Sequence, residues 1–174
     1  MMRAGKIYTW LFALTLGMAA VFPVASQAQE AELVGRFGDW DAYTRGTAGS
    51  RFCYMVSKPK KASLRSRRGE IFFLVWHRPD QKEFDVVQVD IGYPFKDRSE
   101  AVIRIGGDSW SLFTRDESAW AYKPADDKAL VAALRKGSRL TVKGVSTRNN
   151  PTTDSYSLKG TSTAYKAIGK ACGR

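Results

Sequence analysis

The sequence predicts a mainly β protein, and its pattern favours a β-sandwich over a small β-barrel. Two apolar segments, 70–77 and 84–91, flank the turn residues Arg78-Pro79-Asp80 and indicate a central β-hairpin. Further short strand-like segments follow along the chain, separated by turns rich in glycine, proline and aspartate. Only two stretches have a helical period. We therefore expect one short helix near 126–136 and a short C-terminal helix within an otherwise β architecture.

The first strand of the central hairpin is apolar without interruption from Ile71 to Trp76. A strand that is solvated on one face alternates apolar and polar residues, whereas an unbroken apolar run needs cover on both faces. The second strand is rich in β-branched residues, which suit a pleated, packed surface. We therefore expect both faces of the first strand to be covered. The residues expected in the core are Phe73, Val75, Val87 and Val89.

The other strands are predicted from alternating apolar and polar residues between turn signals. Gly38-Asp39 interrupts the first two strands, and Gly106-Gly107-Asp108 forms a hairpin-type turn later in the chain. A polar, basic loop from Lys58 to Gly69 leads into the central hairpin. The predicted segments are 33–37, 40–44, 51–57, 101–105, 110–114, 119–121, 139–143 and 153–159.

The internal helix is predicted from a change of period. Asp126 can cap a helix over 127–136, because an aspartate side chain accepts hydrogen bonds from the free amides of a first turn. Leu130 and Leu134 are four residues apart and therefore share one face. Basic residues fill the last predicted turn and Gly137 follows, which is a typical helix end.

The two cysteines, Cys53 and Cys172, predict one disulfide, since an even cysteine count in an exported chain favours oxidation. The bond joins an early strand to the short C-terminal helix, which Ser162 or Thr163 can cap. The alternative is a cysteine nucleophile paired with His77, the only histidine. A single histidine and two cysteines argue against a zinc site, and no cofactor is expected.

The N-terminus has the pattern of a secretory signal peptide. Two basic residues precede an apolar stretch over 11–21, and Ser26-Gln27-Ala28 places small residues at the −3 and −1 positions of a cleavage site. The apolar stretch is shorter than the ~20 residues that a membrane span needs. We expect a signal peptide over 1–28, cleavage after Ala28, and a single exported domain over 29–174 without a transmembrane span.

The chain is strongly basic. It has 28 basic and 17 acidic residues and a formal net charge of +11, or 26 − 17 = +9 once the two leader charges are removed. Such a surface favours anionic partners. The densest charge lies in the polar loop before the central hairpin, and we expect it to bind a polyanion unless it is merely solvated. Its basic residues are Lys58, Lys60, Lys61, Arg65, Arg67 and Arg68. Nucleic acid fits less well, because the loop has no aromatic residue for base stacking.

The order of several short motifs resembles one exported proteobacterial family, the invasion-associated locus B proteins. These motifs are Phe37-Gly-Asp-Trp40, Cys53, Gly92-Tyr-Pro-Phe-Lys96, Leu112-Phe-Thr114, Ala119-Trp120, Lys136-Gly-Ser138, Val142-Lys-Gly144, Thr152-Thr-Asp-Ser-Tyr-Ser-Leu-Lys-Gly160 and Cys172. The resemblance implies an immunoglobulin-like β-sandwich in the periplasm or at the cell surface. Members from pathogens are linked with entry into host cells. The family has no established catalytic residues, so none is carried over. The chain departs from its pattern at Asn149-Asn150-Pro151.

We therefore expect a non-catalytic envelope protein that binds a protein or polyanionic partner. An envelope carbohydrate-active hydrolase is the first alternative, because Asp108, Asp116 and Glu117 could supply paired carboxylates, although aspartate near turns usually serves the backbone. A sugar-stacking face of tryptophans would support it. The candidates for that face are Trp40, Trp76, Trp110 and Trp120. A periplasmic chaperone-like module is the second alternative, and an open edge strand would be its sign.

Overall fold

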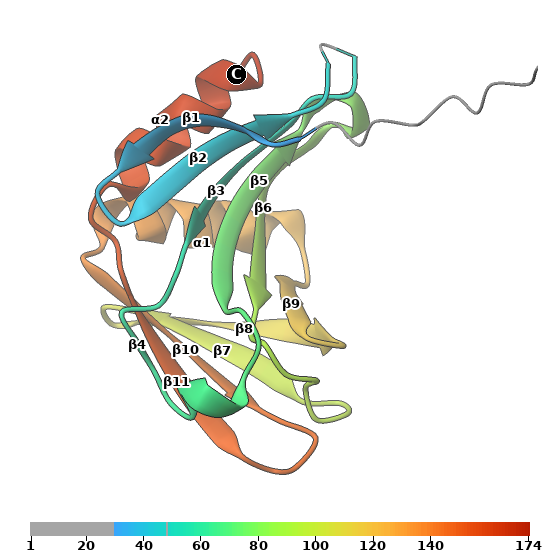
Figure 1. Ribbon diagram of the computed structural model, residues 1–174, viewed down its shortest axis with the longest axis vertical. Coiled ribbons are helices and arrows are strands. Elements are labelled where there is room, and N and C mark those ends of the chain that lie inside the picture. The colour runs from blue at the N-terminus through green and yellow to red at the C-terminus, as the bar shows by residue number, and fades with distance from the viewer. Residues whose placement is uncertain (1–29, 48) are drawn as a thin grey trace, which may run out of the picture.

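The computed structural model describes residues 30–47 and 49–174, so the predicted signal peptide, 1–28, lies outside the described residues. Eleven strands form one antiparallel sheet in the order β1-β2-β3-β5-β6-β9-β8-β7-β10-β11-β4 (Figure 1). The strands are β1 (Glu32–Phe37), β2 (Trp40–Arg45), β3 (Phe52–Ser57), β4 (Lys61–Ala62), β5 (Phe72–Arg78), β6 (Glu83–Asp90), β7 (Glu100–Ile105), β8 (Asp108–Arg115), β9 (Ser118–Ala121), β10 (Arg139–Val145) and β11 (Pro151–Ser157). The helices are α1 (Pro124–Lys136) and α2 (Thr161–Ala171), with short 3₁₀ turns η1 (Arg65–Arg67) and η2 (Pro79–Gln81).

The sheet bends around a single hydrophobic core, so that its two halves face each other (Figure 1). Phe73 of β5 packs edge-on against Trp40 of β2, with ring centroids 6.0 Å apart, and against Tyr156 of β11 at 5.8 Å. Because β5 and β11 lie in different halves of the sheet, the contact between Phe73 and Tyr156 crosses the core. Both helices pack on the inner face, α1 against β6 and α2 against β1, β2 and β3. The expected mainly β, sandwich-like fold with two helices is confirmed.

The central hairpin is formed by β5 and β6, and its inward side chains make the middle of the core. Burial alternates along β5, because successive side chains of a strand point to opposite faces. The outward side chains Phe72, Leu74 and Trp76 are only half-buried. Phe73, Val75, Val87 and Val89 are all fully buried, as predicted. The expectation that both faces of this strand are covered is wrong for the described chain, because both helices lie on the inner side.

Helix α1 begins earlier than the sequence indicated. Pro124 occupies the first turn, where its missing N–H is not needed, and no side chain caps the helix. The predicted cap at Asp126 is therefore wrong, and Asp126 instead lies within the first turn. Leu130 and Leu134 are fully buried on the face that packs against the sheet, as predicted.

Helix α2 follows Gly160 rather than a Ser162 or Thr163 cap, which corrects the prediction. Gly160 has φ = +93°, in the left-handed region that favours glycine. A Cβ at Gly160 would lie 1.8 Å from the carbonyl oxygen of Phe37, so the close approach of this loop to the end of β1 requires glycine. The helix carries Cys172 at its end to Cys53 of β3, and the predicted disulfide forms with Cα atoms 6.0 Å apart.

The segment that the sequence predicted as a polar loop contains structure of its own. Strand β4 pairs with β11, and backbone bonds from Lys60 N–H to the Ser155 oxygen and from Ser63 N–H to the Thr153 oxygen extend the contact. The turn η1 follows directly. A strand of two residues is too short to show an apolar period, and its partner strand lies about ninety residues away in the sequence. The pairing places the basic residues on the edge of the sheet, beside β11.

Candidate functional site

Most basic side chains of the 58–68 segment are already paired with acids. Lys58 lies 2.7 Å and Arg65 3.2 Å from the carboxylate of Glu70. Lys60 forms an ion pair with Asp39. The hydrogen bond from Lys58 lowers the pKa of Glu70, and the one from Lys60 lowers that of Asp39. These exposed pairs neutralise part of the charge that the sequence showed.

Arg68 corrects the predicted polyanion-binding set. Its side chain is 2% exposed, and its guanidinium donates two hydrogen bonds of 2.6 Å to the fully buried carboxylate of Asp154. It also donates to the backbone oxygens of Ile91 and Ser63, and it lies over the ring of Tyr93. All five N–H donors of the guanidinium group therefore have an acceptor within the protein. Arg68 fixes the loop to β11 and has no face left for an external anion.

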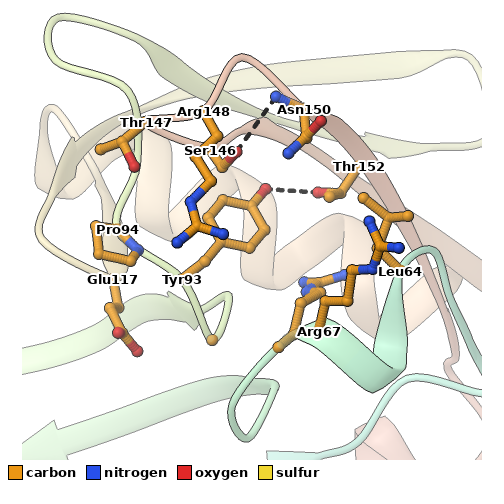
Figure 2. A pocket seen from close by; sticks show the side chains of 12 residues that line it. Leu64, Arg67, Tyr93, Pro94, Glu117, Ser146, Thr147, Arg148, Asn150 and Thr152 are labelled. Carbon is orange, nitrogen blue, oxygen red and sulfur yellow. Dashed lines mark hydrogen bonds between the residues drawn. The ribbon is translucent and has the colours of Figure 1, made fainter.

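Lys61 and Arg67 are exposed and have no acidic partner within 4 Å among the described residues. Arg67 lies on one wall of a pocket of about 340 Å³, and Arg148, from the turn between β10 and β11, lies on the other. Arg148 likewise forms no ion pair with any residue that the structure describes. Figure 2 shows these two arginines entering from different segments, with the Tyr93 ring between them. The pocket therefore carries two uncompensated guanidinium groups.

Hydroxyl groups line the base of the pocket. Tyr93 and Thr152 share a hydrogen bond, and the Ser146 hydroxyl accepts one from the N–H of Asn150. Burial raises the pKa of Tyr93, so its hydroxyl stays neutral. Glu117 is the one carboxylate among the described lining residues, and it lies near Pro94 at the rim (Figure 2). Two guanidinium groups and several neutral hydroxyls suit a phosphate, sulfate or carboxylate.

The carboxylates proposed for glycosidic hydrolysis do not line one pocket together. Glu117 lines this pocket, whereas Asp108 lines a different one between β7, β8 and the end of α1. Asp116 adopts φ = +51° in the turn before β9, which is a backbone role. Among the described residues, no group of three or more histidine, cysteine, aspartate or glutamate side chains is placed to hold a metal ion.

The four tryptophans also fail to form one surface. Trp40 is buried and donates its indole N–H to the Ser157 oxygen, and Trp110 packs against the core. Trp76 and Trp120 are half-buried and point outward. Trp76 follows the parity of the outward side chains of β5, and Trp120 lies opposite Gln88 of β6.

His77 lies in a buried polar cluster that sequence reasoning missed. It is fully buried beside Cys53, its register partner, and Nδ1 accepts a hydrogen bond from the N–H of Asp85. Asp85 Oδ1 in turn accepts from Tyr165 at 2.6 Å and from Arg174 at 2.7 Å. Desolvation lowers the pKa of His77. Desolvation and the hydrogen bond to Asp85 raise the pKa of Tyr165 to about 12. No thiol is available to His77, because both cysteines are in the disulfide.

The edges of the sheet bear on the chaperone-like alternative. One edge is β4, which is only two residues long. The other is β1, whose pairing with β2 is interrupted by a register shift between Leu33 and Gly35. Short strands and bulges are the usual means by which proteins protect a sheet edge against strand addition. Neither edge therefore has the long, regular form that accepts a partner strand.

The bent antiparallel sheet, two inner-face helices and one disulfide define a small sandwich-like β protein. The chain belongs to the Invasion associated locus B (IalB) protein family, whose model matches residues 40–169. Its structure is similar to the crystal structure of invasion associated protein B from Bartonella henselae, with a TM-score of 0.57 and 14% sequence identity over 80% of this chain and 98% of that chain. At this identity the likeness shows the fold alone. No curated protein matches the chain. No helix within the described ranges is long and apolar enough to span a membrane.

Proposed function

We propose that the protein is an exported, non-catalytic component of the cell envelope that binds an anionic partner. The observation that carries this proposal is the pair Arg67 and Arg148, which face one pocket from two segments without an acidic partner in the described chain. Lys61 of β4 is a further cation without an ion pair in the described chain, but it lines a separate pocket with Arg139 and Ser155. Membership of the family supports export, in agreement with the signal-peptide pattern over 1–28.

Binding accounts for this pocket better than hydrolysis does. A hydrolase needs a nucleophile or paired carboxylates positioned at the substrate. The described pocket offers Glu117 without a second acid, and its hydroxyl groups have no adjacent general base. The carboxylate, phosphate and sulfate groups of envelope glycans and lipids suit its arginines.

The test uses the mature protein, residues 29–174, and phosphatidylcholine vesicles that contain lipopolysaccharide, with plain phosphatidylcholine vesicles as the reference. Replacing Arg67 and Arg148 with glutamine should raise the dissociation constant at least about tenfold, since losing charge-assisted hydrogen bonds removes more than about 1.4 kcal/mol. Raising salt from low to physiological strength should slow association of the parent, because the screening length falls to about 8 Å.

The matched control replaces Lys128 of α1 and Lys166 of α2 with glutamine. Both are exposed on the helices, so the same two charges are lost away from the pocket. This variant should bind almost as the parent does. Equal weakening by both pairs would show that only net charge matters, and no weakening by the arginine pair would refute the proposed site.

A further inference from the structure

The outward side of β1, β2, β3, β5 and β6, hereafter the outer face, is unusually apolar. Leu33, Tyr43, Tyr54, Trp76 and Val86 form one row across these five strands, each opposite the next in register. Leu33 is 41% exposed and the other four are half-buried. An antiparallel sheet with one solvated face normally carries polar residues there. The outer face therefore has the composition of a covered surface.

The uninterrupted apolar run from Ile71 to Trp76 leads to the same conclusion. Such a run is typical of a strand covered on both sides. The structure supplies one cover, because both helices and the opposing half of the sheet lie on the inner face. No described segment packs on the outer side of β5. The outer side of β5 is therefore open to a second molecule.

The aromatic rings of the outer face pack against one another. Tyr43 and Tyr54 are stacked, with centroids 5.2 Å apart and an interplanar angle of 17°. The guanidinium groups of Arg45 and Arg78 lie 5.8 Å and 5.3 Å from the Phe52 ring centroid. Tyr43 and Tyr54 each turn one ring face toward the other, and guanidinium groups lie against Phe52, so little ring face is left for a flat glycan. Ring edges and upright side chains instead suit interdigitation with a second sheet.

The charges of the outer face are balanced, unlike those of the whole chain. Arg36 lies 3.8 Å from Asp41, and Arg78 lies 3.9 Å from Glu83. Arg45 forms no ion pair with a described residue, and Asp90, opposite Phe72, offsets it in net charge. The complete sequence carries a net charge of +11. A locally neutral patch gains little from an anionic bilayer, whereas two such patches can face each other without repulsion. The charge pattern therefore favours a second copy of this chain over a lipid surface.

We propose that the outer face packs against the outer face of a second copy, forming a face-to-face dimer about a twofold axis. With strands about 4.8 Å apart and a rise of about 3.3 Å per residue, five strands of about six residues cover roughly 500 Å² per copy. Contact over that whole span in both copies would bury at most about 1,000 Å², the lower limit for a specific interface, so we expect a weak dimer. The twofold arrangement places Tyr54 and Trp76, in the middle of the five-strand row, near the centre of the contact.

The test is sedimentation velocity of the mature protein over a concentration series, with two variants of the outer face and one control. Leu33→Glu places a charge at the rim of the contact, and Tyr54→Glu places one near its centre. Leu64→Glu is the matched control, because Leu64 is 43% exposed, close to the 41% of Leu33, and lies beside η1 away from the outer face.

The parent should sediment as a concentration-dependent dimer. Leu33→Glu should raise the dimer dissociation constant at least tenfold, Tyr54→Glu should give monomer throughout, and Leu64→Glu should behave as the parent. Should Tyr54→Glu fail to fold, Leu33→Glu still decides, since its side chain is exposed. A parent that stays monomeric up to about 100 μM, or a dimer that tolerates Leu33→Glu, overturns the proposal. Substituting Arg67 and Arg148 should leave dimerisation unchanged. The dimer proposal and the anion-binding proposal can therefore fail independently of each other.

Discussion

Replacing Arg68 with alanine should destabilise the fold far more than the same change at Arg67. Asp154 is fully buried, and its two carboxylate oxygens each accept one hydrogen bond of 2.6 Å from Arg68. Removing the guanidinium leaves this carboxylate without its counter-charge, a change that costs about 3–5 kcal/mol. At roughly 3 °C per kcal/mol for a domain of this size, the melting temperature should fall by about 10–15 °C.

The measurement is urea unfolding at pH 7 with the disulfide intact, followed by circular dichroism. Arg67→Ala is the matched control, because Arg67 is exposed and forms no ion pair with a described residue. It should change the free energy of unfolding by less than about 0.5 kcal/mol. The double variant Arg68→Met and Asp154→Leu should recover most of the loss, since a buried pair replaced by apolar groups is often neutral.

A loss below about 1 kcal/mol for Arg68→Ala would contradict this reasoning. It would show that water or another cation reaches Asp154 when the arginine is absent. A double variant that is as unstable as the single one would instead show that packing, and not the unpaired charge, sets the cost.

Three further outcomes are expected. Phe73→Ala should lower the free energy of unfolding by about 3–5 kcal/mol, measured in urea, because Phe73 is fully buried between the two halves of the sheet. Replacing both Cys53 and Cys172 with alanine should cost about 2–5 kcal/mol, since the bond spans 119 residues, and an unchanged urea midpoint would refute that estimate. Burial raises the pKa of Asp127 from 3.8 to about 6. The folded state then holds a proton that the unfolded chain has released, so the contribution of Asp127 to stability should fall as pH rises from about 4 to about 6, while the lowered pKa values of Asp39, Glu70 and His77 act in the opposite direction. Asp127→Asn should remove that contribution relative to the parent, and urea midpoints at several pH values will show whether it does.

Much of the fold was predictable because its signals are local. The glycine and aspartate turns delimit the strands, and the spacing of Leu130 and Leu134 gives the inner face of α1. The helix starts were missed because Pro124 and Gly160, not capping side chains, determine them. Gly160 in particular is explained only by the approach of Phe37, which is distant in sequence.

The candidate site was only partly predictable, because contacts between distant parts of the chain determine which basic residues are exposed and which are paired. Arg67 and Arg68 are adjacent and equivalent in sequence, yet one is exposed and the other is paired with Asp154, 86 residues away. Arg148 lies outside the basic loop and joins it only through the pairing of β4 with β11. The apolar run in β5 predicted cover on both faces, whereas the structure covers only the inner one, because a sequence pattern does not show how many elements of the same chain reach a strand.

The pairing of β4 with β11 also has a kinetic consequence. Lys61 and Ala62 meet Ser155 and Asp154 across about ninety residues, and contacts between such distant segments are slow to form during folding. The two walls of the arginine pocket cannot come together before β11 is in place. Any intermediate that lacks this strand therefore keeps a basic, unattached loop while much of the remaining sheet can already be paired. The moment at which the refolding protein begins to bind anions would therefore report when β4 pairs with β11 at the edge of the sheet.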